Sequence, residues 1–179
     1  MRFFGVLSVL LGLGLAQPAH AQALTQHEVE AKLSIIRDLY NGGPVDDAQV
    51  YKFMTDLVMD DGLYVNILNV EGAPEPMTFS RSGDQLLKHM RESKEKVLKS
   101  TARFEITSFI PQAGNDKADV TYTFWQDSTV ETLTPDGKVQ IVAYESVSKC
   151  EDVYARVAGG IKSEKSTCTV ALKPVEPNL

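Results

Sequence analysis

The two cysteines of the chain, Cys150 and Cys168, restrict its fold more than any other feature, because their spacing defines a strand pairing. Gly159 lies midway between them, and Ala158-Gly159-Gly160 has the composition of a three-residue hairpin loop with glycine at the left-handed position. Folding about Gly159 sets complementary residues opposite one another: Cys150 with Cys168, Glu145 with Lys173, and Val147 with Ala171. The sequence therefore predicts a β-hairpin closed by a disulfide between Cys150 and Cys168.

The first 21 residues have the three parts of a secretory signal peptide. Met1-Arg2 is followed by an apolar run over residues 3–16, and Pro18-Ala19-His20-Ala21 is a small-residue cleavage site. Ala21-Gln22-Ala23 offers a second site, so we expect cleavage after Ala21 or after Ala23. The apolar run is shorter than the roughly 20 residues that span a bilayer. We therefore predict an exported protein, periplasmic or secreted, with no membrane span after cleavage.

Charge and motif content exclude several functions. The formal charge is −6 and becomes −7 when Arg2 is removed with the signal, whereas nucleic-acid binding needs a basic face. The cysteines do not form a C-x-x-C pair, and the histidines of the mature chain, His27 and His89, are not near a cysteine in sequence. Glycine-rich phosphate loops and G-x-S-x-G elbows are absent from the sequence. We expect no nucleic-acid partner, metal or cofactor.

Helical periodicity dominates the first half of the chain. Residues 25–40 form a predicted helix that begins with a capping box between Thr25 and Glu28. A second predicted helix begins at Asp46 and ends near Asp60-Asp61-Gly62, where the aspartates have the position of capping residues.

Two short strands are expected next, over residues 63–70 and 77–80. A capping box between Ser82 and Gln85 starts a third helix, whose apolar face includes Val97 and Leu98.

The last part of the chain changes to the two-residue period of strands. Residues 104–109, 120–125, 139–154 and 165–173 are the predicted strands. We interpret residues 24–174 as a single domain and residues 175–179 as a tail.

The order helix, helix, short hairpin, helix and four long strands resembles the nuclear transport factor 2-like superfamily, which includes ketosteroid isomerase and SnoaL-like proteins. The Asp60-Asp61 step into the first strand and the Ser82-Gly83-Asp84 entry to the third helix contribute to this resemblance. It implies an α+β fold in which a cone-shaped, bent antiparallel sheet wraps around three helices from the N-terminal half and leaves a pocket. The cystatin-like fold is the main alternative, although it has one principal helix.

The resemblance to ketosteroid isomerase implies a carboxylate that moves a proton and a tyrosine that holds an enolate oxygen. The candidates for these roles are Tyr40, Asp60 and Asp61. The second long strand offers Tyr122, Trp125 or Asp127, but this late strand shows no obvious buried acid. A dehydratase would need a histidine base, but His27 and His89 both lie on charged helical segments.

Phe53, Tyr64, Tyr122 and Trp125 are the candidate pocket residues, although the spacing of such apolar side chains favours a packed core. Trp125 shares a strand face with Thr121 and Thr123, where its ring would either cover a pocket or anchor a protein contact. The favoured interpretation is a non-catalytic exported domain that binds a small apolar ligand or a protein partner, which could be a second copy docked through the sheet. One alternative is a cofactor-independent isomerase or dehydratase acting on a small hydrophobic substrate. Another is a soluble component of an envelope or secretion assembly, where related domains share this fold.

Overall fold

The computed structural model describes residues 23–44, 47–92, 96–134 and 136–177. The predicted signal peptide and Asp46 lie outside these residues. The described elements are α1 (Gln26–Asn41), α2 (Asp47–Leu57), β1 (Val58–Val70), β2 (Met77–Ser82), α3 (Gly83–Glu92), β3 (Lys96–Pro111), β4 (Lys117–Leu133), β5 (Val139–Val157) and β6 (Gly160–Val175). In this part of the chain, none of the helices is long and apolar enough to cross a membrane.

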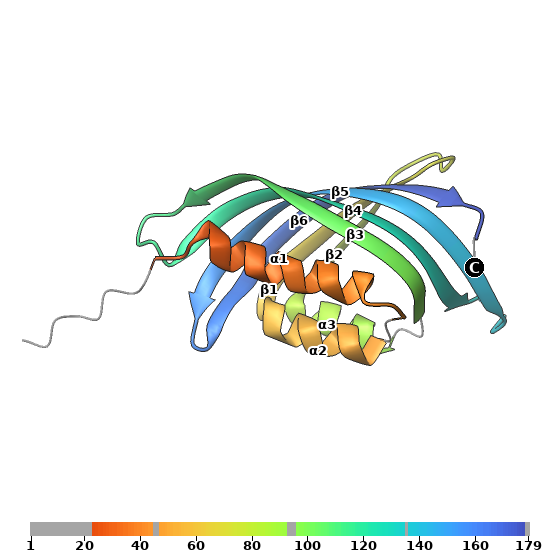
Figure 1. The fold of residues 1–179 in the computed structure, drawn as a ribbon, viewed down its shortest axis with the longest axis horizontal. Coiled ribbons are helices and arrows are strands. Elements are labelled where there is room, and N and C mark those ends of the chain that lie inside the picture. The colour runs from red at the N-terminus through yellow and green to blue at the C-terminus, as the bar shows by residue number, and fades with distance from the viewer. Residues whose placement is uncertain (1–22, 45–46, 93–95, 135, 178–179) are drawn as a thin grey trace, which may run out of the picture.

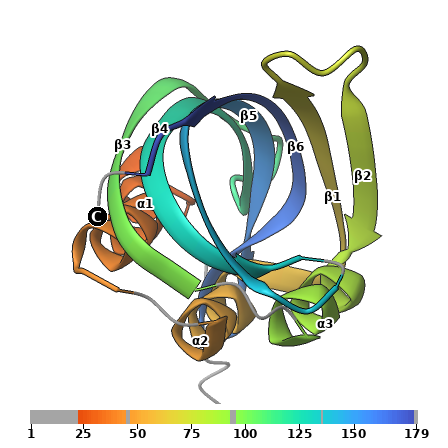
Figure 2. The same cartoon turned by 90° about the vertical axis from the view of Figure 1, so that its right-hand side faces the viewer.

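The six strands form one bent sheet in the order β2-β1-β6-β5-β4-β3. The three helices lie on its concave side (Figure 1), and a view turned by 90° shows β3 to β6 curving over them while the β1–β2 hairpin extends to one side (Figure 2). The predicted α+β cone, with its helices in the N-terminal half, is confirmed. The sheet is mixed, because β1 and β6 run parallel whereas the other neighbouring strands are antiparallel.

Helix α1 is fixed to the sheet at both ends. The predicted capping box is present, since the Thr25 side chain accepts from the Glu28 N–H and Glu28 accepts from the Thr25 N–H. Glu28 also pairs with Arg156 of β5 at 2.8 Å. At the other end, the Asn41 side chain accepts from the Ala102 N–H at 2.6 Å and donates to the Ala102 carbonyl at 2.9 Å. These contacts hold α1 across the concave face of the sheet.

The disulfide hairpin has the predicted register. Cys150 pairs with Cys168 and is bonded to it, with the Cα atoms 4.1 Å apart. The turn is tighter than the predicted three-residue loop, because Val157 pairs directly with Gly160. Gly159 has a φ of +96°, which suits glycine. A bulge at Glu164 adds one residue to β6 and restores the register that symmetry about Gly159 predicts.

Two predicted helix ends are wrong, for the same physical reason. Helix α2 ends at Leu57 rather than near Gly62, because Val58 pairs with Ser163 of β6. Helix α3 ends at Glu92, and Val97 belongs to β3, where it pairs with Val130 of β4. In both cases strand pairing with a distant segment overrides the local helical periodicity.

Candidate functional site

Two adjoining pockets lie between the helices and the concave face of the sheet, and we refer to them as the two lobes of one cavity because they share lining residues. The first lobe has a volume of about 280 Å³ and the second a volume of about 210 Å³. Ile36, Tyr40 and Asn66 line both lobes, so these residues mark the junction. The first lobe is completed by Leu39, Val50, Phe53, Met54, Tyr64, Leu86, Met90 and Ser166. The second is completed by Leu33, Tyr122, Phe124, Gln126, Ser148, Cys150, Cys168 and Val170.

The lining is apolar with a few uncharged polar groups. Neither lobe is lined by a lysine, arginine, histidine, aspartate or glutamate among the described residues. Side chains from α1, α2 and α3 supply most of the first lobe, and β4, β5 and β6 supply most of the second. This composition is typical of a site for a small, mostly apolar molecule.

Three of the four predicted pocket residues line the cavity. Phe53 and Tyr64 belong to the first lobe and Tyr122 to the second. The Tyr64 hydroxyl accepts from the Met59 N–H at 3.0 Å and donates to the Ser163 carbonyl, so it joins β1 to β6 and has no proton left for a ligand.

Trp125 lies elsewhere. It alternates along β4 with the cavity residues Phe124 and Gln126, and therefore faces the convex side of the sheet. There the guanidinium carbon of Arg103 lies 3.7 Å from the centre of the Trp125 ring. The prediction that Trp125 lines the pocket is thus not supported by its position.

The predicted catalytic constellation is not brought together. Tyr40 lines both lobes and packs edge-to-face on Phe124, with the ring centroids 6.5 Å apart. Asp60 and Asp61, in contrast, are exposed on β1, line neither lobe, and do not cap a helix. Their local sequence resembles a helix end, but they lie within β1, in the irregular stretch between the Val58 and Leu63 pairs with β6.

The two candidate histidines also lie apart from the cavity. His27 on α1 and His89 on α3 are both exposed, and neither lines a lobe. The histidine-based dehydratase therefore gains no support from the geometry.

A buried acid that the sequence interpretation missed lies behind the cavity wall. Asp152 on β5 is 5% exposed, and the Tyr122 hydroxyl donates to its Oδ2 at 3.1 Å. Ser166 pairs with Asp152 across the sheet, and the Tyr154 hydroxyl is also near. The Oδ1 atom has no hydrogen-bond partner in the described part of the chain. Asp152 lines neither lobe, but Tyr122 and Ser166 each connect it to one of them.

Burial sets the ionisation of this cluster. Loss of hydration raises the pKa of Asp152 to about 6, although the hydroxyls of Ser166, Tyr122 and Tyr154 favour the ionised form. Burial likewise raises the pKa of Tyr122 and of Tyr154 well above the usual tyrosine range. Both tyrosines therefore remain protonated and act as donors.

The sequence does contain a signal for Asp152. Cys150, Asp152 and Tyr154 alternate along one strand, so they share a face. The disulfide prediction places that face opposite Cys168 of the neighbouring strand, and an inward-pointing cysteine would have placed Asp152 inside as well. The neighbouring Lys149 and Glu151 conceal this signal, because they give the segment the composition of a solvated strand.

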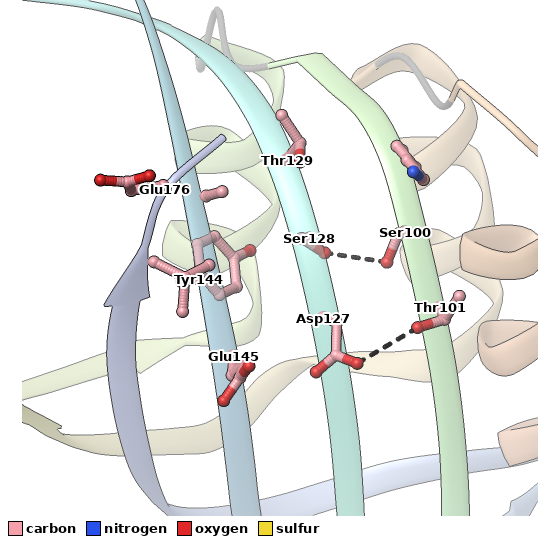
Figure 3. Close-up of a pocket in the computed structure, with 11 residues that line it drawn as sticks. Ser100, Thr101, Asp127, Ser128, Thr129, Tyr144, Glu145 and Glu176 are labelled. Carbon is pink, nitrogen blue, oxygen red and sulfur yellow. Dashed lines mark hydrogen bonds between the residues drawn. The ribbon is translucent and has the colours of Figure 1, made fainter. Parts of the chain in front are cut away.

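Another pocket, of about 180 Å³, lies between the ends of β3, β4, β5 and β6 (Figure 3). Its polar groups are already partly paired: Ser100 with Ser128 at 2.8 Å, and Thr101 with Asp127 at 3.5 Å. Glu145 and Glu176 also line it. The described residues contain no group of three or more histidines, cysteines or acids that could hold a metal ion. This pocket is smaller and more polar than the cone cavity and is the weaker candidate.

Comparison with known proteins gives relatives by fold and none by sequence. No protein-family model matches the chain, and no curated protein matches its sequence. A conserved protein from Planctomyces limnophilus has a similar structure, with 11% identity, a TM-score of 0.54, and coverage of 83% of this chain and 96% of that one. At this identity the similarity concerns the fold alone.

Two further solved structures are similar at lower scores. An NTF2-like protein of unknown function in nutrient uptake from Rhodospirillum rubrum has 17% identity and a TM-score of 0.45, and covers 79% of this chain and 93% of that one. The hexachlorocyclohexane dehydrochlorinase LinA, type 2, has 11% identity and a TM-score of 0.49, and covers 85% and 89%. The order of elements on which the superfamily resemblance was based is present in the structure.

Proposed function

We propose that this chain, which has the nuclear transport factor 2-like fold, is an exported, non-catalytic domain that binds a small apolar ligand in its two-lobed cavity. The observation that carries the proposal is the lining of the cavity, which is mostly apolar and, within the described part of the chain, contains no charged side chain in either lobe. The volumes of about 280 and 210 Å³ approach those of small-molecule sites. The fold by itself does not decide function, so the proposal depends on this site.

Export is part of the proposal and is supported by the disulfide. Cys150 and Cys168 are bonded, and disulfides persist in the periplasm and outside the cell but rarely in the cytosol.

A protein partner receives less support than a small ligand. The convex face of the sheet carries charged residues and threonines, including Arg103, Glu105, Asp127, Glu145 and Lys173. Interfaces that hold stable complexes are depleted of charge at their centres. Homodimerisation through the sheet and membership of an envelope assembly stay predictions.

Filling the cavity is expected to abolish ligand binding. Ile36 lines both lobes, so Ile36→Trp places an indole at the junction. The preceding residue, Ile35, is 50% exposed, and Ile35→Trp is the matched control. We expect the fluorescent probe N-phenyl-1-naphthylamine to bind the wild-type protein and the control saturably, and Ile36→Trp to weaken its binding at least about tenfold, which is about 1.4 kcal/mol.

Two results of the probe measurement would contradict the proposal. Absence of saturable probe binding to the folded wild-type protein, or undiminished binding to a folded Ile36→Trp variant, would show that the cavity does not receive an apolar ligand. Far-ultraviolet circular dichroism establishes that each variant is folded.

Proton transfer next to a carbonyl group is a second candidate function, favoured by the Tyr122–Asp152 pair. An acid with a pKa of about 6 is suited to general base catalysis near neutral pH. Asp152 does not line the cavity, so the substrate carbon would pass its proton to the Tyr122 oxygen while the Tyr122 proton moves to Asp152. The enolate would regain a proton by the reverse path. This dependence on a relay makes catalysis the second candidate.

Deuterium exchange separates the two functions. If the pair is catalytic, the wild-type protein in D₂O should accelerate α-proton exchange of 2-tetralone about 100-fold or more over buffer, as followed by NMR. Asp152→Asn should remove the acceleration, and Glu151→Gln, which changes the exposed neighbour on the same strand, should retain it. Exchange at the buffer rate would eliminate this candidate for α-protons of neutral ketones.

A further inference from the structure

Besides Tyr40, which also lines both lobes, Asn66 carries a polar side chain at the junction of the two lobes. Its side chain belongs to the lining of both, and it shares the concave face of β1 with Tyr64. In the described part of the chain the Asn66 amide makes no hydrogen bond, whereas the Tyr64 and Tyr122 hydroxyls are engaged by the protein. An amide offers donors and an acceptor together, so it can bind a hydroxyl or a carbonyl group.

The surroundings of Asn66 disfavour a charged ligand. Neither lobe has a lysine, arginine or histidine among its described lining residues to pair with an anion. The buried acid nearest the wall, Asp152, would repel an anion whenever it is ionised. The described residues of the cavity walls also include no carboxylate that could pair with a cation. A charge buried without a partner is costly, so an uncharged molecule fits best.

We infer that the ligand is an uncharged molecule with two apolar parts joined through a hydroxyl or carbonyl group, and that Asn66 holds this central group. One apolar part occupies the lobe that contains Phe53 and Met54, and the other occupies the lobe that contains Phe124 and Val170. The inference rests on the proposed function and adds the chemical class of the ligand to it. Ser148 is a polar group of the second lobe only, so it is less suited to a central position.

A matched series of small molecules tests the inference. Diphenylmethane has two rings and no polar group, benzhydrol adds a central hydroxyl, and diphenylacetate adds a central carboxylate. Displacement of N-phenyl-1-naphthylamine from the wild-type protein at pH 7 gives their relative affinities. We expect benzhydrol to bind about fivefold more tightly than diphenylmethane, the effect of one hydrogen bond, and at least about tenfold more tightly than diphenylacetate.

Variants assign the preference to Asn66. Asn66→Leu keeps the side-chain size and should reduce the advantage of benzhydrol over diphenylmethane to less than about twofold. Asn69→Leu is the matched control, because residue 69 lies on the same strand but faces the convex side. It should keep the full preference.

The outcomes distinguish the inference from the function on which it rests. Equal binding of the three molecules, or tightest binding of diphenylacetate, would overturn the inference while leaving an apolar ligand site in place. A preference for benzhydrol that persists in folded Asn66→Leu would also overturn it, because another group would then hold the hydroxyl. If the probe itself fails to bind wild-type protein, the proposed function fails first. The wild-type comparison remains decisive even if Asn66→Leu does not fold.

Discussion

Replacement of both Cys150 and Cys168 by alanine is expected to lower the free energy of unfolding by about 3 kcal/mol. The disulfide joins residues 18 apart in sequence, and in the chain-entropy description closing a loop of this length restricts the unfolded chain by that amount. For a domain of this size the loss corresponds to a decrease in melting temperature of about 10 °C. Urea denaturation followed by circular dichroism measures the free energy, and thermal denaturation measures the temperature.

Reduction of the wild-type protein is the matched control for this prediction. Dithiothreitol should lower the stability of the wild-type protein toward that of the double variant, and should leave the double variant unchanged. A loss of less than about 1 kcal/mol in the double variant would contradict the prediction. It would indicate that hydrogen bonds along β5 and β6 already hold the two strands together in the unfolded ensemble.

The fold was predictable where local patterns and tertiary contacts agree. The capping boxes at Thr25 and Ser82 mark true helix starts, because both boxes form in the folded protein. The disulfide hairpin was predictable to the residue pair, because a symmetric arrangement of cysteines and charges specifies one register. Local signals failed at Val58 and Val97, where pairing with distant strands ends helices that the sequence pattern extends.

The site was less predictable than the fold, because side-chain direction depends on register. Phe53, Tyr64 and Tyr122 line the cavity, but Trp125 faces the opposite side of the same sheet. Aromatic composition could not distinguish these two faces. The buried acid was missed for a different reason, since Asp152 stands beside exposed charged residues in sequence.

Asp152→Asn is expected to make the protein more stable at alkaline pH and to change how its free energy of unfolding depends on pH. Burial raises the pKa of this carboxyl to about 6 in the folded protein, whereas an unfolded aspartate has its ordinary value of 3.8. The folded protein thus binds the proton more tightly than the unfolded chain does. The stabilising contribution of the protonated Asp152 carboxyl is complete below pH 4 and is lost as the pH rises through 6. For a pKa difference of about two units the loss is about 3 kcal/mol.

Asparagine keeps the size and the polarity of a neutral Asp152 but does not ionise, so its stability lacks this pH dependence. Urea denaturation at pH 4.5 and at pH 8 should show the free energy of unfolding of the Asn variant rising by about 2 kcal/mol relative to that of the wild-type protein between the two pH values. Glu151→Gln, at the exposed neighbouring position, is the control and should follow the wild-type curve at both pH values.

Parallel stability curves for the wild-type protein and Asp152→Asn would contradict this account, because they would mean that Asp152 has the same pKa in the folded and unfolded states. The hydroxyls of Ser166, Tyr122 and Tyr154 would then have to compensate for the lost hydration of the carboxylate. Such an aspartate would be ionised throughout the neutral range and would be too weak a base for proton abstraction from carbon. The same measurement therefore bears on both functions: diverging curves leave the second candidate its base, whereas parallel curves remove it and leave ligand binding as the function that the cavity supports.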